Sequence, residues 1–147
     1  MAILGMTLKR LGWRTTMILG ILGHAARFAV FAFFPENQAL VVAINVVHGV
    51  AYAFFFATVY IFVDEFFPKD ARASAQGLFN LMILGLGPLV ANVVGPKLIG
   101  ETFNTANGVD FRSLFLVPFG AAVAAAIILA IFFHPPKTVQ TPVDARH

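Results

Sequence analysis

The segment 45–62, NVVHGVAYAFFFATVYIF, combines membrane-length hydrophobicity with side chains able to bind a polar solute or carry a proton. At 100° per residue of an α-helix, five of these side chains fall within an arc of about 100°. They are Asn45, His48, Tyr52, Phe55 and Phe56. Hydrocarbon penalises polar groups, so polar residues within a membrane usually face a bundle interior or a water-filled cavity. We therefore predict that this stripe binds substrate.

His48 has a second predicted role within the stripe. The ordinary imidazole pKa of about 6.5 suits a proton carrier, so His48 is a candidate for proton coupling. Phe55 or Phe56 offers a flat face to an aromatic ligand. The alternative is that Asn45, His48 and Tyr52 hydrogen-bond to neighbouring helices and only hold the bundle together.

A weaker polar face follows in the third apolar segment. Gln76 and Asn80 share a helix face with Ile83 and Gly87. Two amides can hydrogen-bond a polar solute, which makes Gln76 and Asn80 further substrate-binding candidates; the alternative is a helix–helix contact. Two ridges of small residues favour close helix packing, and Pro88 and Pro96 predict bends. The ridges are Gly87, Ala91 and Gly95, and Ala122, Ala126 and Ala130.

These side chains must be positioned by membrane helices. The chain is 59% hydrophobic and only 12% charged, with a mean hydropathy of +0.85, whereas soluble domains are nearer one half and one quarter. It has no cysteine, which excludes disulfides and cysteine-based metal sites. We predict an all-α integral membrane fold with four spanning helices. The spans are 15–34, 39–63, 74–99 and 113–133, with 1–14 as the end of a preceding helix and a cytoplasmic loop, and 134–147 as a cytoplasmic tail.

The positive charges fall unevenly on the two sides of this topology. The larger group consists of Lys9, Arg10, Arg14, Lys69, Arg72, Lys137 and Arg146, and the smaller of Lys97 and Arg112. By the positive-inside rule the larger group is cytoplasmic. This asymmetry explains a pI near 9.7 without nucleic acid as a partner. Arg27 stands apart in the first span, near His24; it either snorkels toward the headgroups or is a buried functional residue.

Two stretches resemble known transporters. The corner 5–14, GMTLKRLGWR, resembles the short cytoplasmic signature of the major facilitator superfamily, although Lys9 stands where an aspartate is usual. The stretch 48–77 is more specific and is similar to the tenth helix, the following loop and the start of the eleventh helix in the nucleoside:proton symporter family of that superfamily. The matching positions are His48, Gly49, Tyr52, Tyr60, Asp64, Pro68, Arg72, Ala75, Gln76 and Gly77.

The resemblance implies a function. The four helices would be numbers nine to twelve of a twelve-helix transporter in a bacterial inner membrane, with Tyr52 and Phe56 in contact with a nucleoside. It departs at Ala53, where family members often have an acidic residue, so substrate and coupling ion stay open. Asp64 and Arg72 bracket a cytoplasmic loop and, with Arg10, are gating candidates. The alternative for Asp64 and Arg72 is an exposed ion pair contributing about 0–1 kcal/mol.

Four helices supply only part of a transporter. Alternating access needs two bundles around a central site, so we expect an N-terminal half, covalently attached or separate, and a chain that is the C-terminal part of something longer. The alternative is a truncated or non-transporting four-helix protein with a structural role. No catalytic constellation, metal-ligand spacing or phosphate-binding glycine loop is present in the sequence, so we expect no enzyme activity, no metal and no cofactor. The expected partners are a nucleoside-like solute and the lipid bilayer.

Overall fold

The computed structural model describes residues 2–136, and nearly all of that range is helical. Residues 137–147 of the predicted tail, with Lys137 and Arg146, lie outside the described residues. Within the described range, four helical stretches are long and apolar enough to cross a membrane. They are Leu4–Phe33, Gln38–Phe66, Lys69–Thr102 and Phe111–Phe132. The predicted class, an all-α membrane protein with four spanning helices, is confirmed.

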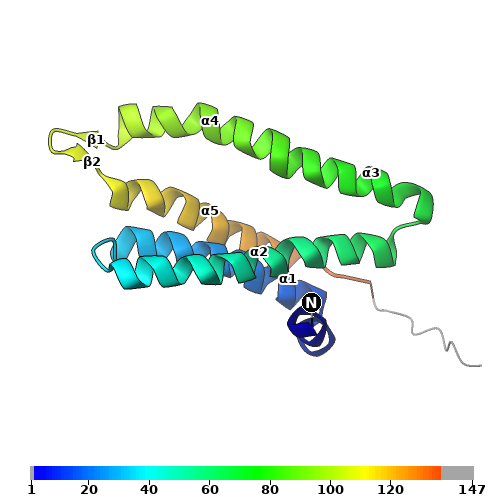
Figure 1. Ribbon diagram of the computed structural model, residues 1–147. Helices are drawn as coiled ribbons and strands as arrows, with labels where there is room; N and C mark the ends of the chain where they lie inside the picture. Colours follow the sequence, from blue (N-terminus) through cyan, green and yellow to red (C-terminus); the bar gives the residue numbers. More distant parts are fainter. Residues whose placement is uncertain (1, 137–147) are drawn as a thin grey trace, which may run out of the picture.

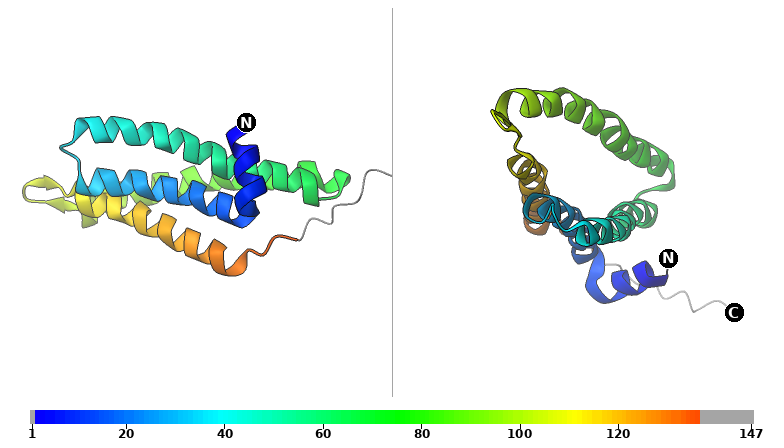
Figure 2. Two further views of the ribbon diagram at one scale, coloured as in Figure 1. Left: turned by 90° about the horizontal axis from the view of Figure 1, so that it is seen from below. Right: turned by 60° about the vertical axis from the view of Figure 1, so that its left-hand side comes forward.

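Helix α1 (Ala2–Phe33) is sharply bent near its start. Gly12 has φ 77° and ψ 172°, and a positive φ of this kind is open to glycine because it lacks a Cβ. The Thr16 hydroxyl donates a 2.8 Å hydrogen bond to the Gly12 carbonyl at the bend. The first part of α1 therefore turns away from the long part, as the darkest blue ribbon shows in Figures 1 and 2.

The long part of α1 lies between α2 (Gln38–Phe66) and α5 (Phe111–Phe132) and packs along both (Figure 2). Small residues permit this close approach, as is usual where helices meet in membranes. A Cβ added to Gly20 would lie 2.8 Å from the Cβ of Phe55, and one added to Gly23 would overlap Ala51. On α5, Ala126 of the predicted alanine ridge is buried.

Helices α1, α2 and α5 form one layer. Trp13 and Arg14 of α1 lie at one end of this layer, with the C-terminal ends of α2 and α5. Trp13 of α1 packs edge-on against Phe62 and Phe66 of α2, with ring centroids 5.6 and 5.7 Å apart. Arg14 donates from Nη1 to the Ala130 carbonyl near the end of α5, at 3.3 Å. The basic corner of α1, the end of α2 and the end of α5 thus share one side, as the positive-inside assignment requires.

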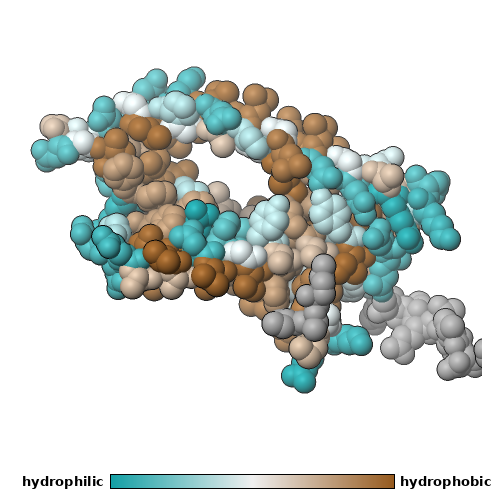
Figure 3. All heavy atoms as spheres, viewed as in Figure 1, coloured by the Kyte–Doolittle hydropathy of each residue, from teal (hydrophilic) through white to brown (hydrophobic). Residues whose placement is uncertain are grey.

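The third spanning stretch is a continuous rod that stands away from the layer. It consists of α3 (Lys69–Asn80), the π-helical segment η1 (Leu81–Leu86), α4 (Gly87–Lys97) and the π-helical segment η2 (Leu98–Thr102). The rod packs against α2 through α3, while α4 packs against none of the three helices of the layer. Figures 1 and 3 show an arch with an open space beneath it. The ridge predicted for close packing, Gly87, Ala91 and Gly95, has no helix of the described chain against it.

Polar residues start the helices on the opposite side. The Asn37 side chain accepts a 3.0 Å hydrogen bond from the Leu40 N–H and caps α2. A hairpin of β1 (Asn104–Thr105) and β2 (Gly108–Val109) leads to Asp110, which caps α5. Hydrogen bonds from the Ser113 hydroxyl and backbone N–H lower the pKa of Asp110, so this carboxylate stays ionised at neutral pH.

Several helix boundaries differ from the predicted spans, two of them at the turn between α2 and α3. Helix α2 continues to Phe66 rather than 63, and the third helix begins at Lys69 rather than 74. Hydropathy marks the part of a helix that lies in lipid, whereas the backbone hydrogen bonds continue into the charged region beyond it. Pro68 immediately precedes the rod with φ −56°, close to the helical value that proline imposes.

The close contact of Gly20 and Gly23 with α2, called here the α1–α2 seam, gives a test of the fold. Gly23→Ala should destabilise the protein by about 1–3 kcal/mol, because the new methyl group overlaps Ala51 in a seam that has no room for it. Thermal unfolding in detergent would measure the change. Gly49→Ala is the matched control, since nothing lies within 4 Å of a Cβ built on Gly49. Equal melting temperatures for the two variants would contradict the close seam.

Candidate functional site

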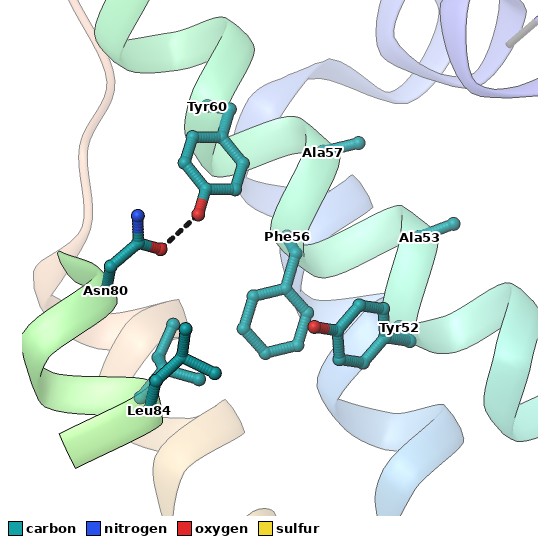
Figure 4. A pocket seen from close by; sticks show the side chains of 8 residues that line it. Tyr52, Ala53, Phe56, Ala57, Tyr60, Asn80 and Leu84 are labelled. Carbon is teal, nitrogen blue, oxygen red and sulfur yellow. Dashed lines mark hydrogen bonds between the residues drawn. The ribbon is translucent and has the colours of Figure 1, made fainter. Parts of the chain in front are cut away.

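A pocket of about 340 Å³ lies between the middle of α2 and the α3–η1 part of the rod. Its size is within the range typical of small-molecule sites. Figure 4 shows Tyr52 and Phe56 projecting from α2 toward Leu84, with Tyr60 and Asn80 bonded to each other beside them. The lining residues are Tyr52, Ala53, Phe56, Ala57, Tyr60, Asn80, Ile83 and Leu84.

The aromatic part of the pocket is a tilted stack. The rings of Tyr52 and Phe56 have centroids 4.1 Å apart and planes inclined by 33°. Phe79 of α3 supports Phe56 from the facing helix, with centroids 6.0 Å apart, and also contacts the ring of Tyr60. Flat aromatic faces held in this way are suited to an aromatic ligand. Tyr52 is 49% exposed, so its face is accessible.

The polar part of the pocket joins the two walls. The Tyr60 hydroxyl of α2 donates a hydrogen bond to the Asn80 side-chain carbonyl of α3 (Figure 4). The Asn80 amide nitrogen has two donor hydrogens that this bond does not use. Together with the Tyr52 hydroxyl, the pocket therefore offers donors and acceptors beside its aromatic stack. This combination can hold a ligand that has both an aromatic ring and a polar edge.

The rest of the predicted stripe on α2 does not reach this pocket. Asn45 is exposed and donates from Nδ2 to the Val41 carbonyl of its own helix, at 2.7 Å. Phe55 lies over Gly20 of α1 and contacts Phe79. His48 faces α1, where its Nδ1 lies 2.9 Å from Nδ1 of His24.

Helix phase explains this division of the stripe. Relative to buried Ala51, which contacts Gly23 of α1, Phe55 and His48 lie at about 40° and 60° around α2 at 100° per residue. Tyr52 and Phe56 lie at about 100° and 140° on the same count. One edge of the arc thus meets α1 and the other faces the pocket. The two explanations considered for the stripe, helix contact and cavity lining, each describe one part of it.

Gln76 and the predicted gating residues lie outside the pocket. Gln76 donates from Nε2 to Asp64 at 3.0 Å, joining α3 to α2 without lining the pocket. Arg72 donates from Nε to the Phe67 carbonyl at 3.0 Å. Asp64 and Arg72 are therefore bonded to different groups in the described conformation. Arg10 is exposed on the first part of α1.

Five pocket residues were not among the predicted site residues, namely Ala53, Ala57, Tyr60, Ile83 and Leu84. Tyr60 lies about 80° from Tyr52 around α2, outside the predicted arc, although its spacing of four from Phe56 places it next to that residue. Ile83 was noted only as sharing a face with Asn80, and Leu84 carried no polar signal. Both belong to η1, where the Gly87 N–H bonds to the Met82 carbonyl five residues back. Pro88 follows directly; it lacks an N–H and would crowd the carbonyl four residues before it in a regular α-helix.

The chain was compared with known proteins. The family model described as nucleoside H+ symporter matches residues 1–138. The chain belongs to this family. It is similar to the xanthosine permease of Escherichia coli, with 30% identity over 90% of this chain and 33% of the permease. It is also similar to the nucleoside permease NupG of the same organism, with 32% identity over 92% of this chain and 32% of NupG.

The chain thus spans about one third of the length of these curated relatives. No solved structure matches it with significant similarity. The family assignment confirms the resemblance to the nucleoside:proton symporter family, and the four apolar helices agree with a multi-pass membrane protein.

The Tyr60–Asn80 bond is testable without substrate. Tyr60→Phe and Asn80→Ala should each lower stability by about 0.5–1.5 kcal/mol, because each removes one side of the same neutral hydrogen bond. The double variant should be little worse than the more damaging single variant. A double-mutant cycle on thermal or denaturant unfolding measures this coupling. Strictly additive losses would show that the two side chains do not interact.

Proposed function

We propose that this chain is the substrate-binding C-terminal part of a proton-coupled nucleoside transporter. The observation that carries the proposal is the pocket in which the Tyr52–Phe56 stack lies beside the Asn80 amide. A nucleoside combines an aromatic base, polar base edges and ribose hydroxyls, and proteins commonly bind bases by stacking and edge hydrogen bonds. Membership of the nucleoside H+ symporter family supports the same substrate class.

In this proposal the base stacks on Tyr52 or Phe56. Asn80 donates to a polar edge of the base, and the Tyr52 hydroxyl remains for the ribose. Gln76 and Asn45 have smaller roles, since each is already bonded within the chain. His48 lies one turn from Tyr52 on α2 and is the proton-coupling candidate.

Transport by alternating access requires a second bundle around the site. The pocket supports this requirement, because it is open on the side not covered by α2 and the rod, and Tyr52 is half exposed. We propose that an N-terminal half, with the arrangement of the major facilitator superfamily, completes the cavity in a bacterial inner membrane. Asp64 and Arg72 would form a gate latch only by exchanging their present partners, Gln76 and the Phe67 carbonyl. A non-transporting structural role is not favoured by the family match.

The proposed stack predicts the effect of two substitutions. Tyr52→Ala and Phe56→Ala should each weaken nucleoside binding by roughly ten-fold or more, since base–aromatic stacking contributes about 1–3 kcal/mol. Equilibrium binding of labelled nucleosides to the purified transporter measures the effect. Val46→Ala is the control, because Val46 is 71% exposed on another face of α2. Equal affinities for all three variants would refute this pocket as the nucleoside site.

The proposed N-terminal half predicts the size of the native polypeptide or complex. An antibody against residues 137–147 should detect a band of roughly two to three times the mass of this chain in native membranes, as expected for a two-bundle transporter. Crosslinking before electrophoresis tests for a separate partner. A species only at the mass of this chain, with and without crosslinking, would contradict the two-half architecture.

A further inference from the structure

A pair of histidines joins the apolar helices α1 and α2. Nδ1 of His24 lies 2.9 Å from Nδ1 of His48, and the two rings meet edge to face with centroids 4.6 Å apart. A nitrogen–nitrogen distance of this length is a hydrogen bond, which requires one nitrogen to donate and the other to accept. The geometry therefore places one proton between the two rings.

The number of protons that this pair can hold follows from the bond. In the neutral pair, one ring has its proton at Nδ1 and donates, while the other has its proton at Nε2 and accepts. A further proton enters at the free Nε2 of the donor ring and makes the bond charge-assisted, which strengthens it. A second further proton would place hydrogens on both Nδ1 atoms and break the bond. The pair thus takes up one proton without losing its geometry.

The pair lies near the centre of the bilayer. His24 is nine residues from the end of α1 at Phe33, and His48 is ten residues from the start of α2 at Gln38. At 1.5 Å per residue these separations are about 14 and 15 Å, close to half of a hydrocarbon core of about 30 Å. Ionisable residues at this depth are costly and usually serve a function.

Arg27 is the charged group that acts on both imidazoles. It lies one turn along α1 from His24; its guanidinium covers the Phe31 ring at 5.1 Å, and its buried Nε has no hydrogen-bond partner among the described residues. A fixed positive charge here opposes every added proton, and it opposes the second most effectively because that proton also meets the charge of the first. No described acidic residue is near enough to favour one.

The other charged groups on the packed helices lie at helix ends. On α2, Asp64 is sixteen residues from His48, about 24 Å along the helix, and Glu36, just before the helix, is twelve residues from His48, about 18 Å at the same rise. On α1, Arg14 is ten residues from His24, about 15 Å away. On α5, Arg112 lies over Phe33 at the outer end, beside Asp110. The electrostatics of the pair are therefore set by the two rings and Arg27.

We propose that His24 and His48 together form the proton-binding site of this transporter and exchange one proton in each cycle. The inference rests on the proposed function and deepens it, because the carrier becomes a two-residue site that includes His24. His48 lies four residues before Tyr52 on α2, so the two side chains are neighbours on the helix surface. A change in the bond between α1 and α2 is thereby transmitted to the pocket through one turn of α2.

Transport by the native-length protein in proteoliposomes tests this site. His24→Gln and His48→Gln should each reduce nucleoside accumulation driven by a pH gradient by at least ten-fold, and abolish proton influx coupled to nucleoside. Both variants should retain exchange of nucleoside across the membrane, which needs no net proton movement. His134→Gln is the control, since His134 lies beyond α5 and contacts only the carbonyl of Phe132, two residues before it, among the hydrogen-bonding groups described.

Proton influx coupled to nucleoside that survives in His24→Gln would overturn the two-residue site and leave His48 alone as the proton carrier. Wild-type protein without nucleoside exchange would overturn the proposed function itself, and with it this site. If a variant fails to fold, ¹⁵N NMR of the wild-type histidines still decides the question. An NMR scalar coupling between the two nitrogens of the Nδ1–H···Nδ1 bond should persist while the pair takes up one proton. Its absence in both the neutral and the singly protonated pair would refute the pair.

Discussion

The close approach of α1 and α2 at Gly20 and Gly23 determines what the rest of the structure can do. With no side chain on these two residues, Ala51 and Phe55 pack directly against the backbone of α1. That contact sets the rotation of α2 about its axis. His48 is then brought to His24, while Tyr52 and Phe56 are turned toward the rod. His48, bonded to His24, and the aromatic pocket residues therefore occupy adjacent faces of one helix because a van der Waals seam fixes its orientation.

Membrane composition made the helices easy to predict, because hydrocarbon leaves few alternatives to a helix for a long apolar segment. The stripe on α2 was also visible, since helical periodicity places its side chains on one side. Its division into two parts was not visible. Forty degrees of rotation separate a residue that contacts α1 from one that faces the pocket, and the partner helix alone decides which is which. Periodicity gives the relative directions of side chains but not their partners.

Other features depended on contacts across long sequence separations. The 24-residue interval between His24 and His48 carries no motif, and each histidine alone resembles an isolated polar residue. Tyr60 and Asn80 are joined through a turn whose geometry depends on Pro68. The small-residue ridge on α4 signalled close packing, yet the described chain places no helix against it. In that case the sequence pattern predicts a contact that the described residues do not form.

The arch formed by α3, η1, α4 and η2 has a mechanical consequence. It contacts α2 through α3 and continues into the hairpin at its other end, while α4 packs against no helix of the layer, so α4 is held in place by the hydrogen bonds of the rod itself. The π-helical segment η1 is the place where the rod is expected to bend, because the hydrogen-bond spacing changes there ahead of Pro88. Ile83 and Leu84 sit on that point and form one wall of the pocket. Bending of a single helix would thus change the width of the pocket while the seam between α1 and α2 stays closed.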